Sequence, residues 1–422
     1  MTRYFLLIIT LVCVVSQMKG QEFKMDLDFR DRFEYRHGFS TLFPDDADPA
    51  AFVRQRARLN LDYQTEWLEA YLSVQDISTW GDTRQILAAD DNHSFMLFQA
   101  WVGISIGQNW GLKAGRQVIS YDNQRILGGL DWAMQGRFHD ALLIKYLKND
   151  FLFDLGFAFS QQNEPVIGTG YDITGFFTYK TMQYGYFKKV WNKSVTSFLF
   201  MNNGFQAYTG ENNDIPDGTY NMQTTGVFFN FPAGNFSFEG NVYYQFGKAS
   251  KNTDLSAYDL ALEVGFKPGS TLFAIGYEML SGTDQTGESK SHSFFPLYGT
   301  NHKFNGYMDY FYVGNHANNV GLNDLYGKIM LKPGVNNSLL IKAHYFSSNA
   351  ELTDDADKYL GTEVDVVFTQ KLMNNVNLNV GYSHMFAGDS MSLIKGGAPT
   401  DNTNNWFYLQ LNVDPVLFTH TF

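Results

Sequence analysis

The chain has 422 residues, of which 44% are hydrophobic, 17% aromatic and only 18% charged, and its mean hydropathy is −0.25. No apolar run after residue 20 is long enough to span a bilayer as a helix, and charges are too sparse for a disordered or coiled-coil chain. The formal net charge of −12 argues against nucleic acid as a partner. A large soluble β-protein or an outer-membrane β-barrel remains.

Residues 1–20 are expected to be a secretory signal peptide. Arg3 supplies a positive charge, residues 4–15 form an apolar segment too short to span a bilayer, and Ser16 and Gly20 are small residues that suit cleavage. The single cysteine, Cys13, lies within this segment, so the mature chain would have no disulfide. A closed, hydrogen-bonded sheet is one way to stabilise such an exported chain.

Residues 21–422 are expected to form one domain in which polar and apolar residues alternate repeatedly. The polar positions of the first two alternating segments are Lys24, Asp26, Asp28, Arg30, Arg32, Glu34 and Arg36, and then Arg54, Arg56, Arg58, Asn60 and Asp62. The same period recurs near residues 235–246, 259–266 and 375–383. In a β-strand, this period places polar side chains on one face and apolar side chains on the other.

The connections between these segments are alternately short and long. Short turns are predicted near residues 64–66, 107–110, 148–150, 191–193, 231–235, 267–270, 332–336 and 371–375. Polar, mostly longer loops are predicted near residues 37–51, 79–93, 121–138, 162–178, 204–218, 248–254, 283–320, 348–358 and 388–403. Eight turns and nine loops join 18 strands. This predicts an all-β fold, a transmembrane antiparallel barrel with short periplasmic turns and long extracellular loops, whereas a soluble sandwich need not sort its connections in this way.

The chain ends in Phe422, shortly after an alternating strand over residues 406–413. A terminal aromatic residue resembles the assembly signal of outer-membrane barrels, so outer-membrane lipid and the barrel-assembly machinery are the expected partners. Pro415 interrupts the strand just before this end, and a coincidental tail is the alternative.

All eleven arginines lie at or before residue 137. Arg30, Arg32, Arg54, Arg56 and Arg58 belong to the polar faces of the first two strands, which would line the lumen because the opposite faces must meet lipid. Guanidinium groups in a pore attract and orient anions, carboxylates especially. Alternatively, nearby carboxylates such as Asp28 and Glu34 pair with these arginines and merely hold the wall together.

The segment from Gly115 to Lys145 crosses a polar, glycine-containing loop between two strands. Arg125, Asp131 and Arg137 lie in this segment. We expect the loop over residues 121–138 to fold into the pore as a constriction, and a cap on the outer rim is the alternative.

Signals for catalysis or metal binding are weak. No Gly-x-Ser-x-Gly, P-loop or His-Glu-x-x-His motif occurs. The pair His139-Asp140 is the one hint of a hydrolase at the rim, and a simple hydrogen bond is the plainer interpretation. The acidic runs at residues 45–48 and 354–357 lack EF-hand spacing, so no metal or other cofactor is expected.

Five segments of the mature chain are similar to a known family: residues 55–59, 115–140, 202–204, 305–311 and 321–326. On these segments the mature chain resembles the alginate-export family of outer-membrane porins, in particular its members from Bacteroidetes-type bacteria. The resemblance implies an 18-stranded barrel with an arginine-rich lumen that passes negatively charged polyuronate. The anion contacts that it implies are Arg30, Arg54, Arg56, Arg58, Arg116, Arg125 and Arg137. The second half of the chain departs from an alginate exporter because it has no arginine.

These observations predict an outer-membrane channel that passes polar, anionic solutes such as acidic oligo- or polysaccharides by passive diffusion. Two alternatives remain: a barrel hydrolase with its site at the extracellular rim, and a structural or adhesion barrel with a plugged lumen.

Overall fold

The computed structural model describes residues 20–83, 95–168, 178–212, 214–285, 289–311, 320–353 and 356–422. Its strands are β1 (Glu22–His37), β2 (Ala50–Gln64), β3 (Leu68–Thr79), β4 (Met96–Ile106), β5 (Trp110–Gln117), β6 (His139–Lys148), β7 (Phe151–Phe159), β8 (Thr181–Trp191), β9 (Ser194–Thr209), β10 (Ile215–Ala233), β11 (Phe236–Ser250), β12 (Thr253–Phe266), β13 (Leu272–Leu280), β14 (Leu322–Gly334), β15 (Asn337–Ser347), β16 (Tyr359–Met373), β17 (Val376–Ala387), β18 (Asn404–Val413) and β19 (Val416–Thr421). The two helical segments are short, η1 (Asn301–Lys303) and α2 (Met391–Ile394). Within these described ranges, no helix has the length and apolarity needed to cross a membrane.

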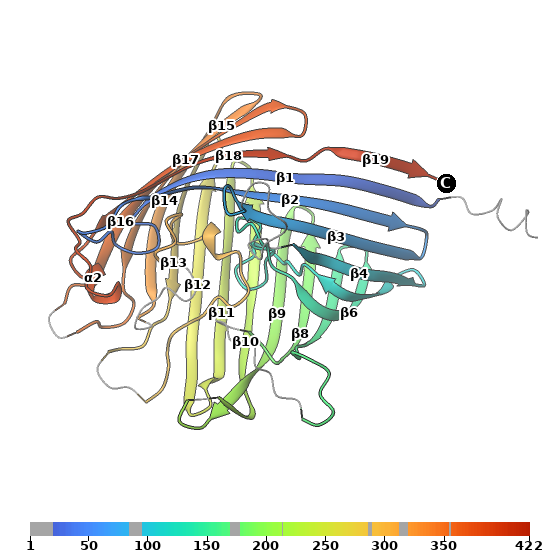
Figure 1. Ribbon diagram of the computed structural model, residues 1–422, viewed down its shortest axis with the longest axis horizontal. Coiled ribbons are helices and arrows are strands. Elements are labelled where there is room, and N and C mark those ends of the chain that lie inside the picture. Colours follow the sequence, from blue (N-terminus) through green and yellow to red (C-terminus); the bar gives the residue numbers. More distant parts are fainter. Residues whose placement is uncertain are drawn as a thin grey trace, which may run out of the picture.

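Each strand pairs antiparallel with the next one along the chain, and the sheet closes where β1 meets β18 and β19. Figure 1 shows the blue β1 lying beside the red strands at the C-terminal end of the chain. Because β18 and β19 are two parts of one interrupted strand, the barrel has 18 strands, as the alternation of turns and loops predicts.

The eight short connections are confirmed as turns between consecutive strands, all at one end of the barrel. The opposite end carries the nine other connections. The one between β9 and β10 is shorter than predicted, because the two strands stay paired as far as Thr209 and Ile215. Amide side chains help to hold them: Asn202 and Gln223 hydrogen bond across this pair of strands.

The last strand is interrupted where the sequence places Pro415. β18 ends at Val413, and β19 resumes pairing with the first residues of β1. The carbonyl oxygen of Pro415 accepts a hydrogen bond from the backbone N–H of Leu27 at 3.1 Å, so proline at this position does not break the seam. The backbone N–H of Phe422 donates to the carbonyl of Gln21 at 2.9 Å, which carries the pairing to the end of the chain.

The buried apolar core lies inside the barrel. The alternation predicts a polar lumen, but inward-facing residues of several strands, such as Met182, Met201 and Trp406, are fully buried against loops that fold in from the extracellular end. Leu127 and Met308 are core residues contributed by two of these loops. The physical reason is that long loops bring apolar side chains of their own, which gain free energy by leaving water. The wall of the lumen is therefore polar in part and apolar in part.

Candidate functional site

The arginines of β1 and β2 form two adjacent rows on the lumen side. Arg30 lies opposite Arg56 in the register, Arg32 opposite Arg54, and Asp28 opposite Arg58. We call the six residues Arg30, Arg32, Arg36, Arg54, Arg56 and Arg58 the arginine wall. Their even-numbered positions share one strand face, the face that the alternation assigns to polar side chains.

One carboxylate from the loop over residues 118–138 bridges the two rows. Asp131 accepts hydrogen bonds from Nη2 of Arg30 at 2.8 Å and from Nη1 of Arg56 at 3.0 Å. Burial by itself would raise the pKa of Asp131, but the two guanidinium groups lower it by more, so the pKa lies below its ordinary value. Asp131 therefore stays ionised and remains a fixed counter-ion for the wall.

Other partners occupy much of the remaining wall. Asp28 accepts a hydrogen bond from Nη2 of Arg56 at 2.6 Å, and Glu34 accepts one from Nε of Arg32 at 2.9 Å. Gln75 accepts from Nε of Arg58 at 2.9 Å. Pairing with carboxylates, the alternative that the sequence leaves open, thus takes place.

Pairing does not neutralise the wall. Five of its six arginines contact three carboxylates, those of Asp28, Glu34 and Asp131. Among the described residues, Arg54 has no carboxylate within the 4 Å that defines an ion pair, and its side chain is only partly buried. The arginine wall and the carboxylates that pair with it therefore carry a net positive charge.

Aromatic rings lie beside three of the guanidinium groups, and that of Arg36 is 4.1 Å from the ring of Phe39. Arg32 lies 4.0 Å above the ring of Trp132, and Arg58 lies 3.8 Å above the ring of Phe98. The ring of Trp132 also stacks at 4.1 Å on that of His302 from a second loop. Stacking of this kind fixes the plane of a guanidinium group while leaving its edge free to donate hydrogen bonds.

The loop over residues 118–138 runs through the interior of the barrel and does not cap the rim. On one side Asp131 contacts the arginine wall. On the other side the Tyr121 hydroxyl donates to Asp154 of β7 at 2.7 Å, and Asp122 accepts from Ser197 of β9 at 2.6 Å. A loop tied to opposite walls narrows the space between them, which is the arrangement expected of a constriction.

Arg125 anchors this loop on the wall that faces the arginine wall. Its side chain is 1% exposed, and its Nε lies 2.8 Å from a carboxylate oxygen of Glu278 in β13. Its Nη2 donates to Asn305 in the loop over residues 281–321 at 2.9 Å. Arg137 likewise donates to the carbonyl of Gly299 in that second loop at 2.9 Å. Arg125 and Arg137 thus join the two inward loops, and Arg125 is not an open anion contact.

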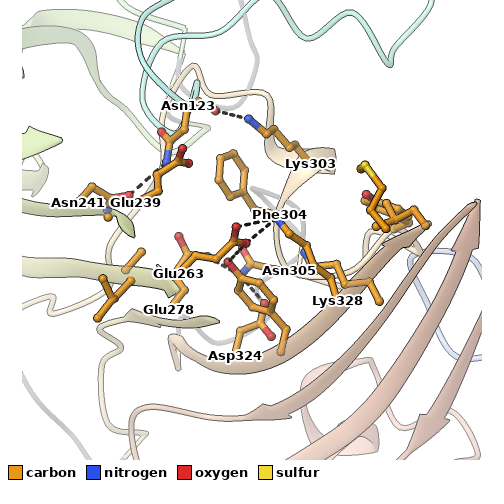
Figure 2. A pocket seen from close by; sticks show the side chains of 18 residues that line it. Asn123, Glu239, Asn241, Glu263, Glu278, Lys303, Phe304, Asn305, Asp324 and Lys328 are labelled. Carbon is orange, nitrogen blue, oxygen red and sulfur yellow. Dashed lines mark hydrogen bonds and ion pairs between the residues drawn. The ribbon is translucent and has the colours of Figure 1, made fainter. Parts of the chain in front are cut away.

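A cavity of about 350 Å³ lies beside these loops, between η1 and strands β11 to β15. Figure 2 shows Glu239, Glu263 and Glu278 around it, with Lys303 and Lys328 reaching in. Lys328 pairs with Glu263 at 2.7 Å. This side of the lumen carries both signs of charge with many carboxylates, in contrast to the arginine wall.

Arg116 is not a lumen residue, and the prediction for this position is wrong. In β5 the lumen side chain is Lys113, which lies 3.5 Å above the ring of Trp101. Arg116 is three positions further on and so faces outward. There it pairs with Asp140 of β6 through two hydrogen bonds of 2.9 and 3.0 Å. The sequence offered no sign of this, because Gly115-Arg116-Gln117 shows no alternation.

The structure does not bring His139 and Asp140 together. His139 is buried and hydrogen bonds to the hydroxyl of Tyr179 at 3.0 Å, whereas Asp140 points outward to Arg116. Neighbouring residues of a strand face opposite sides, so the two cannot act as a catalytic pair. In the part of the chain that the structure describes, no three histidine, cysteine or acidic side chains gather as a metal site. Asp354 and Asp355 of the second acidic run lie outside that part.

The comparisons with known proteins agree with this architecture. Residues 21–396 match the model of one family, described as alginate export. The chain belongs to the alginate export family. Proteins of this family are porins of the outer membrane, and that location and fold apply here. No curated protein matches the chain.

Solved structures of porins share the fold at low identity. A BenF-like porin from Pseudomonas fluorescens is 14% identical with a TM-score of 0.64, and the match covers 94% of this chain and 99% of that one. OccAB1 from Acinetobacter baumannii is 12% identical with a TM-score of 0.63, and the match covers 94% of this chain and 97% of that one. OccK2 from Pseudomonas aeruginosa, solved in complex with glucuronate, is 12% identical with a TM-score of 0.59. That match covers 94% of this chain and 98% of the other.

Proposed function

We propose that this member of the family is a channel through which polar anions, including acidic oligosaccharides, diffuse passively along the arginine wall. The observation that carries the proposal is that the six arginines of the wall outnumber the carboxylates that pair with them, Asp28 and Glu34 on β1 and Asp131 in the inward loop. An anion that leaves water needs replacement hydrogen bonds, and a row of guanidinium groups offers them in sequence. Asp28, Glu34 and Asp131 weaken each step, so that a bound anion can leave again.

The charge contrast across the lumen adds a second reason. A carboxylate-bearing solute would be attracted to the arginine wall and repelled from the side that carries Glu239, Glu263 and Glu278. Such a field orients a solute with one charged end. Glucuronate, the ligand of the similarly folded OccK2, is a solute of this type.

We also infer that residues 1–20 direct export and are removed, and that the barrel-assembly machinery inserts the chain into outer-membrane lipid. The apolar segment over residues 4–15 and the terminal Phe422 support this inference.

The test is electrical. Purified protein in planar bilayers is expected to conduct, with a reversal potential across a salt gradient that reports anion preference. Arg54→Glu changes the charge of the wall by two without removing an ion pair, and it should lower the anion-to-cation permeability ratio about fivefold, equivalent to about 1 kcal/mol. Lys193→Glu, an equal change in the exposed turn between β8 and β9, should leave the ratio unchanged. Cation preference of the unmodified protein would refute the anion role.

The apolar core inside the extracellular half favours one competing function, a structural barrel with a plugged lumen. Absence of conductance in the same bilayers, from protein that remains folded, would support that function. A barrel enzyme finds no support in the positions of His139 and Asp140.

A further inference from the structure

An unpaired carboxylate lies on the lipid-facing side of β1. Asp31 shares its strand face with Phe29 and Phe33, and in the register it lies between Gln55 of β2 and Leu411 of β18. Its Oδ1 is shielded from solvent and has no hydrogen-bond partner among the described residues. A carboxylate on the outer side of a barrel costs free energy where it leaves water, and a hydrogen-bond donor on another protein would offset this cost.

A complementary charged pair lies on the same outer surface, four strands away. Arg116 of β5 and Asp140 of β6 bind each other, and a third N–H of Arg116 donates to the carbonyl of Leu97 at 3.2 Å. A guanidinium group has five N–H donors, so two remain for another acceptor. The side chains stay accessible, 32% for Arg116 and 56% for Asp140.

An apolar hollow separates the two charged positions. Its volume is about 470 Å³, and Ala70, Ala100 and Ala114 line it on three consecutive strands, β3 to β5. Leu61 and Val102 are among its larger lining residues. Small residues allow another protein surface to approach the backbone closely within a membrane.

Three of the shorter strands of the barrel lie at or beside this surface. β5, β6 and β7 have 8, 10 and 9 residues, whereas β1 has 16 and β10 has 19. Eight residues at ~3.3 Å each, tilted by about 40°, rise only about 20 Å, less than the apolar band of about 25 Å that a barrel usually presents. Either the bilayer thins locally or another protein covers this side.

We propose that the outer surface of β1 to β6 is an interface between copies of this chain, in which Asp31 of one copy accepts hydrogen bonds from Arg116 of the next. The occupant is a second copy because both halves of the charge-complementary contact, Asp31 and the Arg116–Asp140 pair, are present on one chain. The inference concerns the outer surface and does not depend on which solute passes through the lumen.

The contact is head-to-tail, so it must close into a ring. Neighbouring strands of an 18-stranded barrel are about 20° apart around the axis, so positions four strands apart are separated by about 80°. Seen from the axis of one subunit, the directions to its two neighbours are about 60° apart in a ring of three and about 90° apart in a ring of four. The geometry points to a small ring of three or four copies.

Cysteine cross-linking in the membrane tests the interface, because residues after Cys13 include no cysteine. Ala57→Cys on β2 together with Ala114→Cys on β5 should give an oxidant-induced ladder that ends at the closed ring. The matched control is Val242→Cys on β11 with Ile275→Cys on β13, both on the outer surface and 47% and 60% exposed. The control pair should give no cross-linked ladder, because β11 and β13 lie outside the interface, and equal cross-linking of both pairs would overturn the proposal.

Charge-reversal variants test whether the Asp31–Arg116 contact itself holds the copies together. Asp31→Arg, added to the Ala57 and Ala114 cysteine pair, should lower the cross-linked fraction about tenfold, and a further Arg116→Asp should restore it. Asp31→Leu should also dissociate the ring without altering the conductance of each barrel. A monomeric unmodified protein, or a ring that Asp31→Leu leaves intact, would reject the interface. Neither result would alter the case for an anion channel.

Discussion

Asp131 is the residue that ties the inward loop to the arginine wall. Its two carboxylate oxygens contact Arg30 and Arg56, and its backbone carbonyl accepts from Arg30 at 2.6 Å. In the proposed channel, this counter-ion would limit the positive charge that the arginine wall presents to a solute.

We predict that Asp131→Asn increases anion preference. The amide keeps the size of the side chain but releases one negative charge, so the reversal potential should move toward the chloride limit. The depressed pKa of Asp131 adds a pH test, since a carboxyl group with a lowered pKa remains charged as the pH falls through the usual aspartate range.

The contribution of Asp131 to the acid response of the unmodified channel, a rise in anion preference, should therefore appear only below the ordinary aspartate pKa of about 4. In Asp131→Asn this part of the response should be missing. An identical acid response in both proteins would show that Asp131 does not set the charge of the constriction.

For single residues, the sequence predicts which way an arginine side chain points better than it predicts the partner that the side chain contacts. Strict alternation over β1 and β2 gives the inward direction of Arg30, Arg54 and Arg56. It fails at Arg116, which lies in a short strand without alternation. The partners of the arginines come partly from a loop about 100 residues away, as with Arg30 and Asp131, and no local pattern encodes such a contact.

The two inward loops form a single element. Backbone hydrogen bonds join them directly, from Gly128 to Tyr298 at 2.9 Å and from Tyr298 to Ile126 at 3.0 Å. Arg125 supplies the charged link between them and the wall, through Glu278 and Asn305. Removing this link should loosen both loops together.

We predict that Arg125→Met increases single-channel conductance. The variant keeps an unbranched side chain but leaves the buried carboxylates of Glu278 and Asp259 without their cation, a change that costs about 3–5 kcal/mol in buried pairs. The loops should then leave the lumen for part of the time, which current recordings would detect as a second, larger conductance level.

Arg125→Lys retains the charge and is the matched variant, with conductance close to that of the unmodified channel. If Arg125→Met conducts as before, the loops are held by their apolar core alone.

Strands and turns were within reach of sequence analysis because their signals are local: a period of two and turn residues such as Pro268-Gly269. The sequence predicts only some of the residues that line the cavity beside η1. The alternation near Tyr258 marks Asp259 and Glu263 as polar, but the second inward loop carries no comparable pattern, and its contacts with Glu278 and Asp324 arise from the folded barrel.

Closure of the whole barrel depends on the seam where β1 pairs with β18 and β19. β1 pairs with β2 along its full length on one side, and with β18 and then β19 on the other. Without β19, the first residues of β1 would expose unpaired backbone groups close to lipid, which is costly.

We predict that deletion of residues 416–422 strongly reduces the amount of folded barrel in the outer membrane. Heat-modifiable migration in gels would measure it, with the point variant Phe422→Tyr as a control that keeps both the pairing and a terminal aromatic ring. A deletion variant that folds in normal amounts would show that β18 closes the barrel unaided.

The links of Arg125 also bear on the order of events during folding. Arg125 and Asn305 are separated by 180 positions, and Asn305 contacts Asp324 of β14. The constriction therefore cannot form until most of the sheet exists, because its anchors belong to strands that join late in the chain. Contacts at such separation carry a large loop-closure entropy and form slowly. A newly closed barrel would first be a wide, leaky pore, and it would acquire its permeability barrier only when the two loops meet inside it.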